Sequence, residues 1–168
     1  MQIIETTRLR LRDITLDDSE FILELLNTPK FVRFIGDRGV RSVDDAREFV
    51  ETKYIQSYRD HGYGLYTVEL KQTGEPVGMC GFVRRDTLPG PDIGFAFLPR
   101  FEGMGYGFES SDAILDYGRD TLGFTQLFAI TSQDNEVSGK LLIKLGFRFD
   151  RLVMMNNGEE LKLFERAL

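Results

Sequence analysis

The sequence predicts an α+β fold in which a mixed sheet of antiparallel and parallel strands carries helices on both faces. Segments typical of β-strands, with alternating or continuous apolar residues, recur throughout the 168 residues. Amphipathic segments with helical spacing separate the later strands, so an antiparallel meander leads into a parallel crossover. No linker, repeat or low-complexity tract divides the chain, and we therefore expect one domain over residues 1–168.

The first third of the chain predicts one strand followed by two helices. Leu9–Asp13 alternates leucine with arginine, which is typical of a half-exposed strand. Residues 15–26 and 42–54 have apolar side chains at helical spacing. Each begins with Thr or Ser three residues before Asp, a pattern typical of helix N-termini. Asn27-Thr28-Pro29 is expected to end the first helix.

The rest of the chain predicts most of the sheet and two more helices. Four segments predict inner strands: Gly64–Leu70, Val77–Val83, Asp92–Leu98 and Gln126–Ser132. A long helix is expected between Gly105 and Leu122, and a shorter one at Val137–Leu145 with Val137 facing inward. The turn at Asn156-Asn157-Gly158 predicts a closing hairpin between Arg148–Met155 and Glu160–Glu165.

The composition limits the chemistry that the protein can carry out. The chain has one histidine, His61, and one cysteine, Cys80. These two residues cannot form a disulfide within the chain or a four-ligand zinc site, so we expect no metal. A Ser-His-Asp triad would have to use His61. Acid–base chemistry is therefore expected from carboxylates, Tyr, Ser, Lys or water.

The charge and the hydropathy pattern limit the partners. A net charge of −6 argues against binding to nucleic acid and suits a cationic partner such as an amine. No apolar run approaches the ~20 residues that span a bilayer, and the N-terminal residues lack the apolar core of a signal peptide. We therefore expect a cytoplasmic protein with no membrane partner.

Residues 92–109 hold the clearest functional signal. A strand ends there, and Arg100-x-x-Gly103-x-Gly105 leads directly into a helix. The free N–H groups of a first helical turn favour a bound anion, and glycines let the backbone approach a phosphate. The residues that follow Gly105 exclude a P-loop, and the glycine spacing excludes a dinucleotide-binding fingerprint.

This pattern, with Tyr106 and Glu109 behind it, resembles motif A of the GNAT acetyltransferase superfamily, which binds the pyrophosphate of acetyl-CoA. Asn135-x-x-Ser138 is similar to the second CoA-contacting segment of that superfamily. Upstream segments resemble the Rim-type branch, which is named for N-terminal acetylation of ribosomal proteins. They are Thr6–Arg12, Thr28–Gly36 and Gly64–Phe82.

The resemblance implies that acetyl-CoA, the acetyl donor, enters between two splayed parallel strands, here Asp92–Leu98 and Gln126–Ser132. The residues implied to bind it are Phe95, Phe97, Leu98, Arg100, Gly103, Met104, Gly105, Tyr106, Gly107, Asn135 and Ser138. Three arginines of the first strand form an exposed face or, alternatively, meet the 3′-phosphate of the donor: Arg8, Arg10 and Arg12.

The implied reaction is direct attack of a primary amine on the acetyl thioester. Asp92 is the candidate base, or else an acid that only caps the preceding turn. Many members of the superfamily have a Tyr as general acid where this chain has Leu142. Ser138 is then nearest the sulfur, or it bonds only to the backbone. Asn135 is a ligand of the pantetheine arm, the helix N-cap, or both.

Arg33, Phe34 and Tyr63 fall where the family builds its acceptor site, so the resemblance implies that they contact substrate. The acceptor is expected to be a primary amine, either a protein N-terminus or a small molecule such as an antibiotic or an amino acid. A sensor that binds acyl-CoA without turnover is a third hypothesis, motivated by the missing Tyr. The resemblance also implies a monomer or a homodimer.

Overall fold

The computed structural model describes the backbone of residues 1–168 and every side chain except that of Gln2. Over these residues, eight strands form one sheet in the order β1-β2-β3-β4-β5-β6-β8-β7. Their bounds are Gln2–Glu5 (β1), Leu9–Asp13 (β2), Leu65–Leu70 (β3), Pro76–Val83 (β4), Asp92–Phe97 (β5), Gln126–Thr131 (β6), Arg148–Met154 (β7) and Glu160–Ala167 (β8). Neighbouring strands are antiparallel except β5 and β6, which run parallel. The predicted mixed sheet is therefore confirmed.

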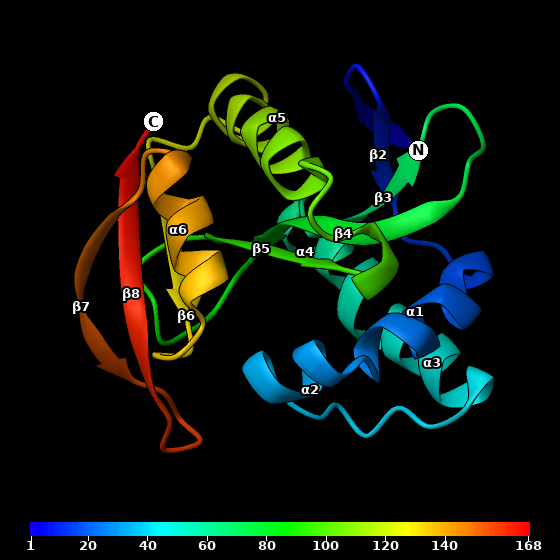
Figure 1. Ribbon diagram of the computed structural model, residues 1–168, viewed down its shortest axis with the longest axis horizontal. Helices are drawn as coiled ribbons and strands as arrows, with labels where there is room; N and C mark the ends of the chain where they lie inside the picture. Colours follow the sequence, from blue (N-terminus) through cyan, green and yellow to red (C-terminus); the bar gives the residue numbers. More distant parts are fainter.

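Helices cover both faces of this sheet. Their bounds are Ser19–Leu26 (α1), Pro29–Phe34 (α2), Val43–Phe49 (α3), Gln56–His61 (α4), Tyr106–Asp120 (α5) and Glu136–Lys144 (α6). A π-helical stretch, Val50–Ile55, joins α3 to α4. In Figure 1, α1, α2 and α3 lie on one side of β4 and β5, and α5 lies on the other. Among the described residues, no helix is long and apolar enough to cross a bilayer.

Alternation along the strands divides the core into two layers, because successive side chains point to opposite faces. Ile93 packs in the layer that contains Ile114 of α5. Met79 and Leu98 pack in the other layer, which contains the buried side of α1. Each fully buried side chain of this kind stabilises the fold by about 1.5–3 kcal/mol. Asp92 alternates with Ile93 and therefore points toward the helical layer of α1 to α3.

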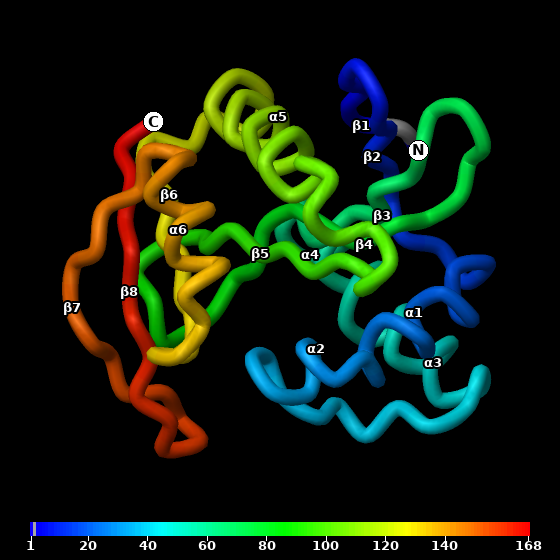
Figure 2. The backbone as a smooth tube through the Cα atoms, in the orientation of Figure 1, coloured from blue at the N-terminus to red at the C-terminus, as the bar shows by residue number. Residues whose placement is uncertain are grey.

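Strands β5 and β6 touch at one point and then separate, and we call the wedge between them the splay. Asp92 and Phe128 form the one residue pair that the structure describes between them, and the Phe128 N–H donates to the Pro91 carbonyl at 3.1 Å. Figure 2 shows β5 running away from β6 beyond this point. The edge of β5 that faces β6 is therefore without a strand partner over most of its length.

Three local features differ from the sequence prediction. Strand β1 is not predicted, because four residues are too few to show a period. Pro29 begins α2, whereas the sequence predicts only that it ends α1. Proline fits the first position of a helix. The Thr28 hydroxyl caps the same helix by accepting a hydrogen bond from the Phe31 N–H at 3.4 Å. Val137 is 76% exposed, whereas Leu142 is buried and provides the inward side of α6.

Arg10 and Arg12 of β2 are half-buried in a network of ion pairs, which corrects the expectation of an exposed face for these two residues, whereas Arg8 is exposed. Arg12 donates to both carboxylate oxygens of Asp18 at 2.8 Å, and its Nε donates to Glu69 at 3.0 Å. Arg10 donates to the same Glu69 at 2.9 Å. Asp18 and Glu69 are buried, and a buried carboxylate needs such partners. The network therefore joins β2 to β3 and to the start of the helical layer.

Candidate active site

The glycine-rich segment forms an anion-binding loop at the start of α5, and we call residues 103–108 the cradle. Gly103 and Gly105 adopt φ values of +76° and +84°, which cost a residue with a side chain about 1–2 kcal/mol. The Glu109 N–H donates to the Gly105 carbonyl at 3.0 Å, so the N–H groups of residues 106–108 precede the first helical hydrogen bond. A Cβ added to Gly103 would meet no atom within 4 Å, so the loop borders open space. These features fit a diphosphate.

Arg8, which directly precedes β2, lies over the cradle. Its Nη1 donates to the Met104 carbonyl at 2.9 Å, and its guanidinium stacks over the Tyr106 ring at 4.6 Å. Its Nη2 lies 3.2 Å from where a Gly105 Cβ would be. The cradle therefore combines backbone N–H groups with a cationic side chain. The sequence offers no local signal for this contact, because the turn from β1 to β2 brings Arg8 there.

The unpaired edge of β5 leads from the cradle into the splay. The Leu98 N–H donates to the Val77 carbonyl of β4 at 2.9 Å. Because strand residues alternate between the two edges, the N–H and C=O groups of Phe95 and Phe97 face the splay. Both groups of Leu98 are used within the chain, since its carbonyl accepts from the Phe101 N–H at 3.0 Å. Phe95 and Phe97 can therefore pair with an extended ligand, and Leu98 cannot.

Other residues predicted to bind the donor have local partners. Arg100 donates to Glu24 of α1 at 2.6 Å, so its guanidinium has a carboxylate partner within the chain. Gly107 lets α5 approach α6, since a Cβ there would lie 3.3 Å from Leu141. Asn135 caps α6 by accepting from the Ser138 N–H at 3.3 Å. The hydroxyl of Ser138 is not used in that contact.

Asp92 lies at the closed end of the splay and is 1% exposed. Arg85 donates to its two carboxylate oxygens at 3.2 and 3.3 Å. Burial disfavours the charged carboxylate and outweighs the attraction of Arg85, so the pKa of Asp92 rises to about 6. A carboxylate with that pKa is well matched to accepting a proton near neutral pH. Arg85 is a residue that sequence reasoning missed, although the hairpin pairing of Val83 with Asp92 places it close by.

A cavity of about 580 Å³ reaches Asp92 from the face that carries α2 and α3. We call it the acceptor cavity. Its walls include Phe31 of α2, Ile35 directly after that helix, Phe49 of α3, and Phe95 of β5. It therefore meets the splay from the side opposite to α5, so two reactants can approach the Asp92 end of β5 from different faces.

The three predicted acceptor residues lie outside this cavity. Arg33 is exposed, stacks over Phe34 at 4.8 Å and donates to Asp134 at 3.2 Å. Tyr63 is buried in the core, edge-on to Phe82 at 6.1 Å. Helix α2 does contribute to the cavity, but through Phe31, and Ile35 at its C-cap also lines it, because the helical register turns Arg33 and Phe34 aside.

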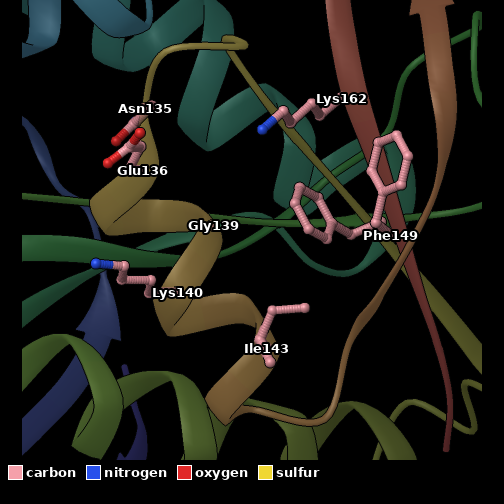
Figure 3. A pocket seen from close by; sticks show the side chains of 8 residues that line it. Asn135, Glu136, Gly139, Lys140, Ile143, Phe149 and Lys162 are labelled. Carbon is pink, nitrogen blue, oxygen red and sulfur yellow. The ribbon is translucent and has the colours of Figure 1, made fainter.

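A second depression, of about 570 Å³, lies on the outer side of α6 against the β7–β8 hairpin (Figure 3). Side chains of Lys140 and Ile143 line it from the helix, and Phe149 and Lys162 line it from the strands. Asn135 lies at its end. Neither the cradle nor Asp92 contributes to it.

Cys80 takes no part in the arrangement described above, whereas His61 is among the residues that line the acceptor cavity. Burial raises the pKa of the Cys80 thiol to about 11, and its sulfur lies 3.7 Å from the Ser111 hydroxyl. His61 is exposed, with its ring 5.7 Å from that of Tyr63. Among the described side chains, no group of three His, Cys, Asp or Glu residues is placed to hold a metal ion.

Comparison with known proteins agrees with this geometry. A family model described as an acetyltransferase (GNAT) domain matches residues 8–148. The uncharacterized N-acetyltransferase YoaA of Bacillus subtilis (strain 168) is 29% identical over 160 residues, which cover 93% of this chain and 90% of YoaA.

Solved structures show the same fold. An acetyltransferase from Agrobacterium tumefaciens str. C58 has a TM-score of 0.84 at 22% identity, over 100% of this chain and 95% of that one. RimL, a ribosomal L7/L12 alpha-N-protein acetyltransferase, has a TM-score of 0.84 at 15% identity, over 100% of this chain and 94% of that one. The family model and the relatives together identify an acyltransferase, and the chain belongs to the GNAT acetyltransferase family.

Proposed function

We propose that this enzyme transfers the acetyl group of acetyl-CoA to a primary α-amine, such as a protein N-terminus. The observation that carries the proposal is the path along β5, from the cradle to a buried carboxylate whose pKa is about 6. At ~3.3 Å per residue, the six residues of β5 span roughly 20 Å, which suits an extended pantetheine arm.

The donor is held at two places on this path. The cradle N–H groups and Arg8 bind the diphosphate, and the free edges of Phe95 and Phe97 pair with the arm as another strand would. Bound acetyl-CoA supplies the thioester, whose carbonyl oxygen becomes negative during the reaction. An unpaired N–H of β5 is the group that stabilises this oxyanion.

The acceptor enters through the acceptor cavity, and Asp92 removes a proton from its ammonium group. The neutral nitrogen then forms a bond to the acetyl carbon. The carbon–sulfur bond breaks, the thiolate leaves with the electron pair, and the nitrogen releases its excess proton to water, which balances the proton that the sulfur takes up. Ser138 is the residue proposed to deliver a proton to that sulfur, in place of the Tyr that Leu142 replaces.

The pKa of Asp92 favours an α-amine over a lysine-like amine. An α-amino group has a pKa of about 7.7–8.0, whereas a lysine side chain has a pKa of about 10.4. A base with a pKa of about 6 therefore removes a proton from an α-ammonium group at a much smaller free-energy cost than from a lysine-like ammonium group. An acetyltransferase for small-molecule amines is the alternative on the same site, and it predicts a different acceptor profile.

The test is release of CoA thiol from acetyl-CoA with matched acceptors. A short peptide with a free N-terminus should react faster than Nα-acetyl-lysine amide by about tenfold or more, measured as kcat/KM. Preference for the lysine side chain or for polyamines would contradict the N-terminal acceptor. If the protein binds acetyl-CoA but releases no thiol with any amine, this result would favour the sensor hypothesis and contradict the proposed acetyltransferase activity.

A cytoplasmic location is part of the same proposal. The one cysteine is buried and unpaired, which suits a reducing compartment.

A further inference from the structure

We propose that the acceptor carries an anionic group, a carboxylate or a phosphate, close to the amine that is acetylated. This inference rests on the proposed function and names the chemical class of its acceptor. It is carried by the charges that line the acceptor cavity.

The lining of the acceptor cavity is opposite in charge to the whole protein. Four cationic side chains line it: Arg38, Lys53, Arg84 and Arg85. Two acidic side chains line it, Asp60 and Asp92, so its net charge is +2 while the chain as a whole carries −6. A cavity of one sign on a protein of the other sign concentrates a ligand of complementary charge.

Most of this positive charge has no partner in the protein. Arg85 is engaged by Asp92 at 3.2 Å. Among the described residues, Arg38, Lys53 and Arg84 form no ion pair, and all three side chains are exposed to the cavity. They are free to bind an anion.

The position of the free cations places the anion near the reacting amine. Arg84 directly follows Val83, which pairs with Asp92 across β4 and β5. Arg38 and Lys53 approach from the helical layer that closes the other side of the cavity. An amine at Asp92 therefore has cationic groups on two sides, which suits an anionic neighbour on the same molecule and repels a polyamine.

The experiment compares acceptors that differ in charge and little in size, with acetyl-CoA as donor. Alanyl-aspartate amide, alanyl-asparagine amide and alanyl-lysine amide form the peptide arm, and glutamate with glutamine forms the small-molecule arm. The acidic member should exceed its neutral counterpart in kcat/KM by about tenfold, which corresponds to about 1.4 kcal/mol. Added KCl should reduce this ratio, because exposed charges are screened. The arm in which the ratio appears distinguishes an N-terminal peptide from a free amino acid.

Arg84→Met and Lys53→Met should each lower the acidic-to-neutral ratio. Arg119→Met is the matched control, since Arg119 lies on α5 and pairs with Asp116 and Asp120. Equal rates for the acidic and neutral members in both arms, or a preference for the lysine peptide, would overturn the inference even if turnover is fast. If no acceptor is turned over, the proposed function fails, and calorimetric titration of the same acceptors into the protein still decides the charge preference.

Discussion

Arg8 and Glu109 are 101 residues apart in the chain and meet at the cradle, where Arg8 Nε lies 2.7 Å from Glu109 Oε1. The Arg8 N–H and the Thr6 hydroxyl donate to the other carboxylate oxygen at 2.9 and 2.6 Å. Burial raises the pKa of Glu109, but these hydrogen bonds outweigh it and hold that pKa below its ordinary value. Glu109 is therefore charged at neutral pH, and Arg8 neutralises it beside the site proposed for the donor phosphates.

Arg8→Gln should weaken acetyl-CoA binding by about tenfold or more, because it removes a phosphate-binding cation and leaves Glu109 as an uncompensated negative charge. Isothermal calorimetry measures this loss. Affinity for S-acetylpantetheine, which has no phosphate, should change little. The same substitution at Arg119, at the far end of α5, is the control. An equal loss for both ligands would indicate that Arg8 acts only through the fold.

Gly103→Ala should reduce acetyl-CoA affinity more than Gly74→Ala does. The two glycines have nearly equal φ values, +76° and +75°, and a Cβ on either would meet no protein atom within 4 Å. Each substitution should therefore destabilise the protein by a similar amount, about 1 kcal/mol in thermal or urea unfolding. Only Gly103 lies where the diphosphate is proposed to bind. Equal affinities in the two variants would remove the cradle from the donor site.

Asp92→Asn should lower kcat by about a hundredfold and leave acetyl-CoA affinity intact, since a general base contributes roughly 10²–10⁴-fold. In the wild type, kcat/KM should rise as the pH passes about 6, where Asp92 loses its proton. The variant should lack that limb of the profile. Asp86→Asn, an exposed acid in the preceding loop, is the matched control. An unchanged profile in Asp92→Asn would exclude Asp92 as the base.

The same substitution should stabilise the fold at neutral pH. The pKa of Asp92 is about 6 in the folded protein against an ordinary value of 3.8, so the folded form binds more protons between these pH values. The free energy of unfolding contributed by this group is therefore highest at low pH and falls as the pH rises through about 6. Asp92→Asn should raise the free energy of unfolding by about 1–3 kcal/mol at neutral pH and by less at about pH 4. Urea unfolding at both pH values measures it. A destabilised variant at neutral pH would show that the ion pair with Arg85 outweighs burial.

The sequence predicts the order of the main strands and helices, because each segment has its own hydrophobic periodicity or its own helix-capping residue. Ser42 illustrates this: its hydroxyl accepts from the Asp45 N–H at 3.0 Å and begins α3, as the spacing predicts. The inward placement of Val137 is wrong, because a stripe on a short helix changes with a shift of one residue in its start.

The site is predicted in part. The glycines of the cradle and Asp92 belong to continuous segments, so their proximity to β5 and α5 follows from local order along the chain. Arg8 is different, since its contact with Met104 spans 96 residues and depends on how the β1–β2 turn packs against α5. The charge of the acceptor cavity likewise depends on three separate elements that converge only in the folded chain.

The splay places an unsatisfied strand edge inside a sheet, where most proteins have continuous pairing. Free N–H and C=O groups on such an edge are a template for any extended chain, including another copy of the same protein. In the function proposed above, acetyl-CoA pairs with this edge, so it completes the sheet as well as delivering the acetyl group, and it covers the groups that another chain would otherwise bind.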